Sequence, residues 1–221
     1  MMTTPETEQQ PARERVYLYV REQILRGTFA GGTFVEEEQI SAAIGVSRTP
    51  VREAFHRLQA ERFIDLLPRR GARVRQVTAQ ELVQLYETRR MIEGHVASRI
   101  CRDGIAVPAQ MPELLGRMRD ADAGADLYAH VELNRLFHRA MVAAPGNDVL
   151  TELYDSLSSR QQLVAMTALG TDPRRLDVIL AEHAELIDAL GARDEARACD
   201  VLDRHLRPVF TIVSRLRGFS G

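Results

Sequence analysis

The chain has 221 residues, 45% apolar and 27% charged, an ordinary globular composition that excludes a chain disordered throughout. Its 29 basic residues are all Arg, and 31 acids leave a formal net charge of −2, which excludes a uniformly basic protein but not a locally basic site. We see no apolar run of the roughly 18 residues that span a bilayer and no secretory signal. Together these features predict a soluble cytoplasmic protein with no membrane partner, in which Cys101 and Cys199 are reduced thiols.

The first third of the chain mixes helical patterns with a loop and a hairpin. Residues 1–12 are rich in Pro, Glu, Gln and Thr, which predicts a flexible tail. Three Gly residues within 27–34 predict a loop. The other expected elements are a helix from Arg13 to a C-cap at Gly27, helices at 36–44 and about 48–61, and a β-hairpin over 63–75.

From residue 78 onward the pattern is helical throughout. Thr78 can N-cap the first helix, with Glu81 completing a capping box. Gly and Pro residues divide the rest into six helices joined by short loops, which indicates an antiparallel bundle. These helices are expected at about 78–103, 110–123, 126–144, 147–169, 173–190 and 194–217. We therefore expect a mainly α protein with three parts, which are residues 1–12, 13–77 and 78–217.

The stretch EEEQISAAIGVSRTPVREAFHRLQAE, residues 36–61, has the spacing of a helix-turn-helix. Gly45 suits the left-handed residue that ends the first helix, and Ser47 or Thr49 can N-cap the second. In such a motif the first residues of the second helix lie nearest the base edges in the major groove. Since Arg can bond bidentately to guanine and hydroxyls suit phosphates, the candidate DNA contacts are Ser47, Arg48, Thr49 and Arg52.

Local charge favours DNA binding over its alternative, a helical hairpin with a solvated charged face. Residues 47–75 hold eight Arg and three acids, a local charge of +5. The predicted β-hairpin follows the helices directly and carries Arg69, Arg70 and Gly71 at its tip. Such a hairpin can act as a wing along the DNA backbone, so these three residues join the candidate DNA contacts.

On these residues the sequence resembles the GntR family of bacterial transcription factors, most closely in GVSRTPVREAF within 35–74. The resemblance implies a winged helix-turn-helix followed by an effector domain, and homodimers that bind short palindromic operators. It also implies that Arg48, Thr49 and Arg52 contact bases or phosphates and that Gly71 lies at the wing tip. Some members carry a further DNA-contacting Arg just before the motif. Here that region reads Glu36-Glu37-Glu38, so we do not assign that role.

The helical part resembles the FCD domain of the FadR-like subfamily, and the resemblance covers about residues 13–217 in all. Six predicted helices match the shorter, VanR-like form of this domain better than the seven-helix form. The resemblance implies that residues 78–217 bind an effector and mediate dimerisation.

Three histidines stand out in the helical part. His138 follows Asn134 by four residues, which places both side chains on one helical face. His183 and His205 each lie about eleven residues from the turn between the last two helices, so an antiparallel hairpin brings them to the same level. Each His alone has an ordinary interpretation as a core or surface residue. Together, three imidazoles and an oxygen suit Zn²⁺ or another divalent metal such as Ni²⁺.

The FCD resemblance favours the metal interpretation. Many such domains bind metal through an Asp, a His four residues later and two His in the last two helices. Asn134, His138, His183 and His205 occupy these positions, with Asn in place of Asp. An amide oxygen can ligate a metal but carries no charge, so direct ligation by Asn134 and ligation by a water both stay open.

The resemblance further implies a small organic acid held near the metal. A carboxylate effector requires a cation, and Arg89 stands at the position that resembles the family's cavity-facing Arg. The alternative for Arg89 is an ion pair with Glu93 or Glu87. Further candidates for the cavity wall are Arg90, Tyr86, Ser158, Arg160 and Gln161.

Two functions follow from these patterns. The favoured one is a ligand-responsive transcription regulator, most simply a repressor and not an enzyme. The alternative is a metal-dependent hydrolase with a DNA-binding appendage, because a three-His zinc site with an open position can activate water. No dedicated general base is visible beside the cluster. Glu182 adjoins His183, but consecutive residues diverge on a helix.

Overall fold

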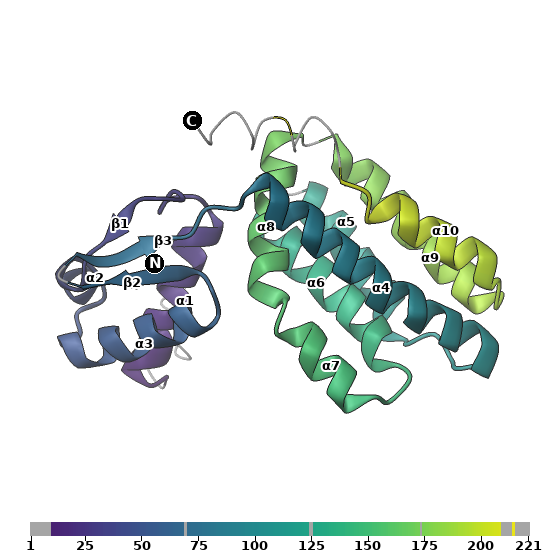
Figure 1. The fold of residues 1–221 in the computed structure, drawn as a ribbon, viewed down its shortest axis with the longest axis horizontal. Helices are drawn as coiled ribbons and strands as arrows, with labels where there is room; N and C mark the ends of the chain where they lie inside the picture. The colour runs from purple at the N-terminus through teal and green to yellow at the C-terminus, as the bar shows by residue number, and fades with distance from the viewer. Residues whose placement is uncertain (1–9, 69, 124–125, 173, 209–213, 215–221) are drawn as a thin grey trace. The chain divides into compact units, whose positions relative to one another are not determined.

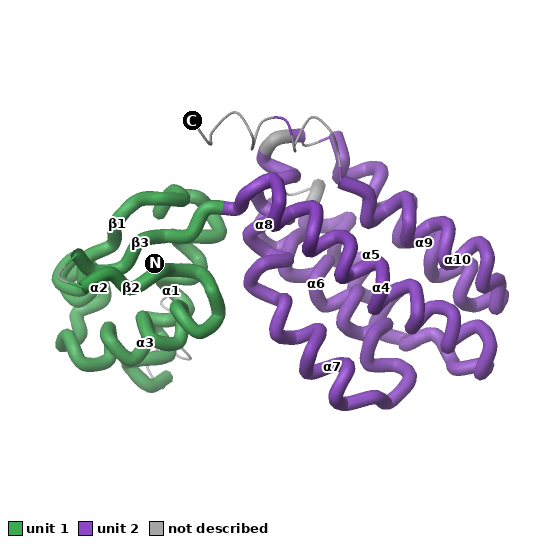
Figure 2. Tube along the Cα trace, viewed as in Figure 1, with its two compact units in different colours: residues 1–76 green, residues 77–221 purple. Residues whose placement is uncertain are grey.

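The computed structural model describes residues 10–68, 70–123, 126–172, 174–208 and 214. The chain divides into two compact units, residues 1–76 and residues 77–221 (Figure 2). The fold is mainly helical, with a small antiparallel sheet confined to unit 1 among the residues described (Figure 1). This confirms the predicted fold class.

Unit 1 combines three helices with a three-stranded antiparallel sheet of order β1-β3-β2. Its elements are α1 (Ala12–Leu25), β1 (Phe34–Val35), α2 (Glu37–Ile44), α3 (Arg48–Ala60), β2 (Ile64–Leu67) and β3 (Gly71–Val74). Strands β2 and β3 form the predicted hairpin, with Ile64 opposite Val74 and Leu67 opposite Gly71. The three predicted helices and the hairpin are therefore confirmed.

Helix α1 fixes the position of α3 through both apolar and polar contacts. Each helix buries one face at four-residue spacing, as its apolar pattern requires. The Tyr17 hydroxyl donates a hydrogen bond to the Glu61 carboxylate at 2.6 Å. The Arg57 guanidinium lies 3.5 Å from the centre of the Tyr17 ring, within cation–π range. Because α3 is the predicted recognition helix, these contacts set how its exposed face is presented.

Strand β1 is absent from the sequence prediction, which treats residues 27–34 as a loop. Phe34 pairs with Arg73 and Val35 pairs with Ala72, so β1 extends the sheet along the free edge of β3. A strand of two residues has no alternation to detect, and it exists because a neighbouring edge offers partners. The close approach requires Gly71, whose φ is +76° and whose added Cβ would lie 2.9 Å from the Val35 carbonyl oxygen.

We predict that Gly71→Ala destabilises the protein more than Gly45→Ala does. Both glycines have left-handed φ angles, so each alanine costs about 1–2 kcal/mol of backbone strain. The two sites differ in the room they leave for a side chain, because an added Cβ at Gly45 has no heavy atom within 4 Å among the residues described. The clash with β1 adds about 1–3 kcal/mol for Gly71→Ala. Urea unfolding followed by circular dichroism measures both losses, and equal losses would contradict the close approach.

Unit 2 is a bundle of helices that begins with α4, which runs from Ala79 to Asp103. The others are α5 (Gln110–Ala123), α6 (Leu127–Ala143), α7 (Asp148–Asp155), α8 (Ser158–Thr171), α9 (Arg175–Gly191) and α10 (Glu195–His205). Thr78 caps α4 as predicted, because its hydroxyl accepts a hydrogen bond from the Glu81 amide at 3.1 Å.

Two buried apolar clusters lie along α4. One joins the C-terminal half of α4 to α5, α6, α9 and α10, and the other joins its first turns to α6, α7 and α8. Between the α4 residues of the two clusters lie Arg89 and Glu93, both buried. Such charges in a helical core require partners, since an unpaired buried charge is strongly destabilising.

The predicted helix at 147–169 is in fact two helices, α7 and α8. The Ser156 hydroxyl donates to the Leu153 carbonyl, and the Leu157 amide bonds to the Tyr154 carbonyl three residues back. These local bonds interrupt the helical hydrogen-bond pattern without Gly or Pro, so the sequence gives no signal that a helix ends here. The count of six helices is thereby corrected to seven within the described part of unit 2, and it no longer supports the shorter, VanR-like form.

The last predicted helix, 194–217, is shorter than expected. Helix α10 ends at His205, and residues 206–208 are not helical. Pro208 explains the ending, because it lacks an amide donor and restricts the residue before it. Of the residues beyond it, only Ser214 lies within the described part of the chain.

The described residues also bear on two other expectations. Cys101 and Cys199 form no disulfide. Among the helices that the structure describes, none has the combination of length and apolar character that crossing a bilayer requires.

Candidate DNA interface and metal centre

One groove of about 820 Å³ in unit 1 is lined by four of the predicted DNA contacts, but not by Ser47 or Thr49. Arg48 and Arg52 line it from the N-terminal half of α3, and Arg70 and Gly71 line it from the hairpin tip. The structure therefore brings the recognition helix and the wing to one surface. Arg69, the remaining wing candidate, lies outside the described residues.

The first turn of α3 exposes the side chains expected to reach DNA. Ser47 occupies the N-cap position as predicted, but its hydroxyl makes no capping hydrogen bond. Arg48, Thr49 and Arg52 are exposed, while Val51 of the same turn is fully buried. The helix thus anchors its apolar face and presents two guanidinium groups and two hydroxyls on the other.

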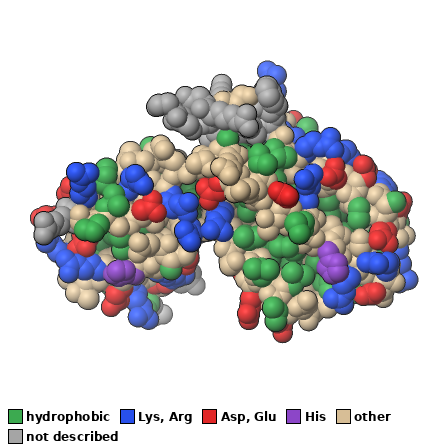
Figure 3. Space-filling view, viewed as in Figure 1, with side chains coloured by type: hydrophobic (Ala, Val, Ile, Leu, Met, Phe, Trp, Pro, Cys, Tyr) green, Lys and Arg blue, Asp and Glu red, His purple; other side chains and the backbone are tan. Residues whose placement is uncertain are grey.

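Glu37 and Glu38 form ion pairs with the candidate DNA-binding arginines. The Glu37 carboxylate lies 2.8 Å from Arg52 Nε, and the Glu38 carboxylate lies 3.1 Å from Arg48 Nη2. Arg52 and Arg48 remain 63% and 59% exposed, so these pairs are weak and phosphate or guanine can replace the carboxylates. Figure 3 shows the same mixture of Arg and acidic side chains across the visible surface of each unit.

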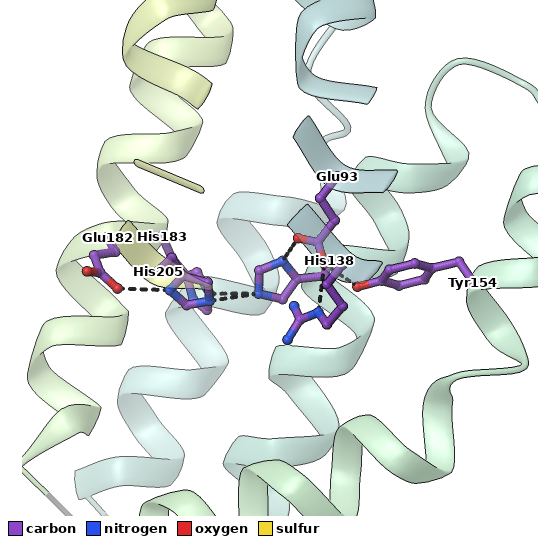
Figure 4. A network of polar contacts seen from close by, with 7 residues as sticks. Glu93, His138, Tyr154, Glu182, His183 and His205 are labelled. Carbon is purple, nitrogen blue, oxygen red and sulfur yellow. Dashed lines mark hydrogen bonds and ion pairs between the residues drawn. The ribbon is translucent and has the colours of Figure 1, made fainter. Parts of the chain in front are cut away.

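The three predicted histidines converge in the core of unit 2 (Figure 4). His138 comes from α6, His183 from α9 and His205 from α10. The Nε2 atom of His138 lies 3.1 Å from Nε2 of His205 and 3.2 Å from Nε2 of His183. Two nitrogen ligands of a tetrahedral zinc ion are about 3.3 Å apart, given Zn–N bonds of about 2.05 Å. These two distances fit ligands of a single metal ion, and the ligand atoms of all three histidines lie within 4.8 Å of one another.

Carboxylates orient two of the three rings. Glu93 accepts a hydrogen bond from His138 Nδ1 at 2.7 Å, and Glu182 accepts one from His205 Nδ1 at 2.9 Å. With the proton held on Nδ1, each Nε2 carries a lone pair that points at the cluster. The third ring, His183, is instead stacked on Phe137 with ring centres 4.2 Å apart.

Burial favours the neutral form of His138 and His183, which is the protonation state that ligates metal. It lowers the pKa of His138 to about 4, even though the nearby Glu93 charge acts in the opposite direction. It also lowers the pKa of His183 well below the usual value, with further lowering by His205 and His138. Three imidazoles with converging Nε2 atoms form a set of donors that suits Zn²⁺ or a similar cation.

A small cavity beside the cluster has unsatisfied polar groups. Its volume is about 40 Å³, and Arg89, Asn134, Gln161, Tyr86 and His205 are among its lining residues. Arg89 Nη2, Asn134 Oδ1 and Gln161 Nε2 are buried with no hydrogen-bond partner among the residues described. At about 10–15 Å³ for each water-sized group, the space suits one carboxylate group. Ser158 and Arg160 are not among its lining residues.

Arg89 forms the predicted ion pair with Glu93 and also lines the cavity. Its Nε donates to the Glu93 carboxylate at 2.7 Å, while Nη2 is one of the unsatisfied cavity atoms. Burial alone would raise the pKa of Glu93, but the charge of Arg89 and the hydrogen bonds from His138 and Tyr154 outweigh it and hold that pKa far below its usual range. Arg90 instead pairs with Asp203 at 3.0 Å.

Sequence reasoning missed three residues of this site: Glu93 as a partner of His138, Tyr154, and Glu182. The Tyr154 hydroxyl donates to Glu93 at 2.7 Å. Glu182 does diverge from His183, as expected, but its carboxylate reaches His205 on the next helix (Figure 4). An i, i+4 spacing from Arg89 was the available signal for Glu93, whereas Tyr154 had none.

Comparison with known proteins identifies the family. Residues 12–74 match the description "Bacterial regulatory proteins, gntR family", and residues 84–208 match the FCD domain. The chain belongs to the GntR family. This GntR protein is 30% identical to the "Probable D-xylose utilization operon transcriptional repressor" of Paenarthrobacter nicotinovorans over 187 residues, which cover 83% of the chain and 80% of the relative.

Two further relatives cover nearly the whole GntR chain. The transcriptional repressor GlaR of Escherichia coli K12 is 26% identical over 207 residues, 90% of this chain and 94% of its own. A crystal structure of a GntR transcriptional regulator from Rhodococcus sp. RHA1 superimposes with a TM-score of 0.74 at 26% identity, covering 93% and 97% of the two chains. The protein is thus a transcriptional regulator with an FCD domain and not an enzyme.

We predict that Zn²⁺ raises the melting temperature of the purified regulator and that Glu182→Gln weakens Zn²⁺ binding by about 10–100-fold. A bound ion at 100 times its Kd stabilises the folded state by about 2.7 kcal/mol. Thermal unfolding at several Zn²⁺ concentrations measures both effects. The matched control is Glu185→Gln on the same helix, whose carboxylate pairs with Arg197 and Arg204 at the surface. Equal Zn²⁺ affinity in the two variants would rule out a role for Glu182.

Proposed function

We propose that this GntR regulator represses transcription in the cytoplasm and responds to a metal ion and a small carboxylate bound inside its helical unit. The observation that carries the proposal is the convergence of three imidazole Nε2 atoms beside a cavity into which Arg89 directs an unsatisfied guanidinium nitrogen. A metal and an anion together would satisfy all of these groups.

Residues 13–77 would form the DNA-binding domain, which acts as a homodimer on palindromic operator DNA. Ser47, Arg48, Thr49 and Arg52 would contact bases and phosphates in the major groove, and Arg69, Arg70 and Gly71 would lie along the backbone as the wing. The groove between α3 and the hairpin tip supports this assignment, because it presents exposed arginines from both sides.

Residues 78–217 would bind the metal and the effector and mediate dimerisation. His138, His183 and His205 would hold Zn²⁺ or Ni²⁺, with Asn134 Oδ1 as a fourth donor. When bound, the ion supplies an open coordination position for a carboxylate oxygen. Of the chain's own residues, Arg89 would pair with the carboxylate, and Tyr86 and Gln161 would close the cavity around it.

The effector would act on DNA binding through the dimer. Occupancy of the helical domain would favour one placement of the two DNA-binding domains over another and so change the spacing of the recognition helices. Half-site spacing is a strict geometric requirement for a dimer that reads two major grooves. A small change of spacing would therefore lower operator affinity.

We predict that Arg52→Ala weakens binding to a selected operator duplex by about 1–3 kcal/mol, because a bidentate guanine contact is worth that much. The duplex would come from repeated selection of a random DNA pool with the wild-type protein, and fluorescence anisotropy would give Kd. Arg204→Ala, an exposed ion-paired arginine of α10, is the control and should bind as wild type does. Unchanged affinity of Arg52→Ala would exclude base contact at this position.

We also predict that a subset of small organic acids raises the melting temperature of the wild-type protein, and does so more with Zn²⁺ present. The stabilisation should fall for Arg89→Gln, which removes one of the two arginines that line the cavity, the buried one with an unsatisfied nitrogen. A thermal-shift screen of mono- and dicarboxylates with and without Zn²⁺ measures it. An acid that stabilises both proteins equally must bind elsewhere.

A further inference from the structure

Glu93 lies at the centre of a buried network that joins three different parts of unit 2 (Figure 4). Its Oε1 atom accepts hydrogen bonds from Arg89 Nε and from the Tyr154 hydroxyl, each at 2.7 Å. Its Oε2 atom accepts one from His138 Nδ1, also at 2.7 Å. The side chain is fully buried, so water does not screen these contacts.

We propose that Glu93 is a positioning residue that couples Arg89 to His138, so that a carboxylate bound at Arg89 and a metal bound at the histidines strengthen each other. The inference rests on the proposed function and deepens it, because it assigns the energetic link between the two ligands. It concerns Glu93, Arg89 and Tyr154, none of which needs to touch the metal.

The physical basis is that three donors share one negative charge. A carboxylate that accepts a hydrogen bond from a ligating His makes that imidazole a better metal ligand. Arg89 and Tyr154 attract the negative charge of Glu93 toward Oε1, whereas His138 bonds to Oε2. The stronger the bonds at Oε1, the less negative charge remains on Oε2 to polarise His138. Any change that weakens those two interactions leaves more charge for His138 and raises its affinity for metal.

Arg89 can transmit such a change because it contacts both Glu93 and the cavity. One nitrogen of its guanidinium, Nε, bonds to Glu93, and another, Nη2, is an unsatisfied donor at the cavity. An anion on Nη2 would neutralise the guanidinium and reduce its pull on Glu93. Metal affinity would then rise, and linkage requires that metal raise the affinity for the anion by the same factor.

The simpler explanation is that Glu93 only neutralises a buried arginine. That role accounts for the contact with Arg89 but not for the second oxygen, which bonds to a candidate metal ligand. The two explanations differ in sign. If the network is only structural, every substitution in it should weaken metal binding through loss of order. If Glu93 couples the sites, removing a competing donor should strengthen metal binding.

The test measures Zn²⁺ affinity of the full-length protein by competition with a chromophoric chelator, with Zn²⁺ alone as the probe. Glu93→Gln should weaken binding by about 10–100-fold. Tyr154→Phe should tighten binding on the order of threefold, because it removes one charge-assisted donor from Glu93. Arg89→Gln should also tighten it. In the Glu93→Gln background both gains should disappear, since their path to His138 is then cut.

Two controls and a fold check complete the design. Tyr19→Phe removes a hydroxyl from unit 1, and Glu185→Gln removes a surface carboxylate from α9, so neither should change Zn²⁺ affinity. Circular dichroism in the presence of a chelator checks that the variants fold, and Tyr154→Phe keeps the test decisive should Arg89→Gln unfold. Weaker or unchanged binding by Tyr154→Phe, or a gain that persists without Glu93, overturns the coupling. A wild-type protein that binds neither Zn²⁺ nor Ni²⁺ overturns the proposed function itself.

Discussion

The helical unit is organised around three buried imidazoles, in which Nε2 of His183 and Nε2 of His205 each lie within hydrogen-bonding distance of Nε2 of His138. The carboxylates hold the protons of His138 and His205 on Nδ1, so the lone pairs of these two rings face each other and repel unless a cation lies between them. The fold keeps His138 and His205 in this orientation with carboxylates and His183 with a stacked Phe137 ring. Each orienting group comes from a helix of the bundle, so the geometry of the site depends on how the helices pack.

Charge balance explains how α4 can turn two charged side chains toward the core of the bundle. Glu93 brings a negative charge into the core, and Arg89 one turn earlier brings the positive charge that compensates it. Buried ion pairs of this kind contribute little net stability, because desolvation offsets most of the attraction. The apolar clusters on either side of the pair supply the stability, and the pair holds Glu93 in position to bond to His138.

The residues that the sequence predicted best are those related by helical periodicity. Asn134 and His138 share a face because they are four residues apart, and His183 meets His205 because both stand equally far from one turn. Glu182 could not be assigned in this way, since its partner lies across a helix–helix contact whose register depends on side-chain packing. The same holds for Tyr154, whose role depends on its contact with Glu93. It also holds for strand β1, which forms only by pairing with β3.

In the DNA-binding unit, the ion pairs of α2 with α3 have a thermodynamic consequence. Arg48 and Arg52 each have a carboxylate as a resident counterion, and these carboxylates belong to the protein rather than to the salt solution. When a phosphate replaces them, cations leave the DNA, but new ones must gather around the freed Glu37 and Glu38. The net release of ions is therefore smaller than the number of arginines implies, and operator affinity falls less steeply with salt concentration than in a protein whose arginines are unpaired.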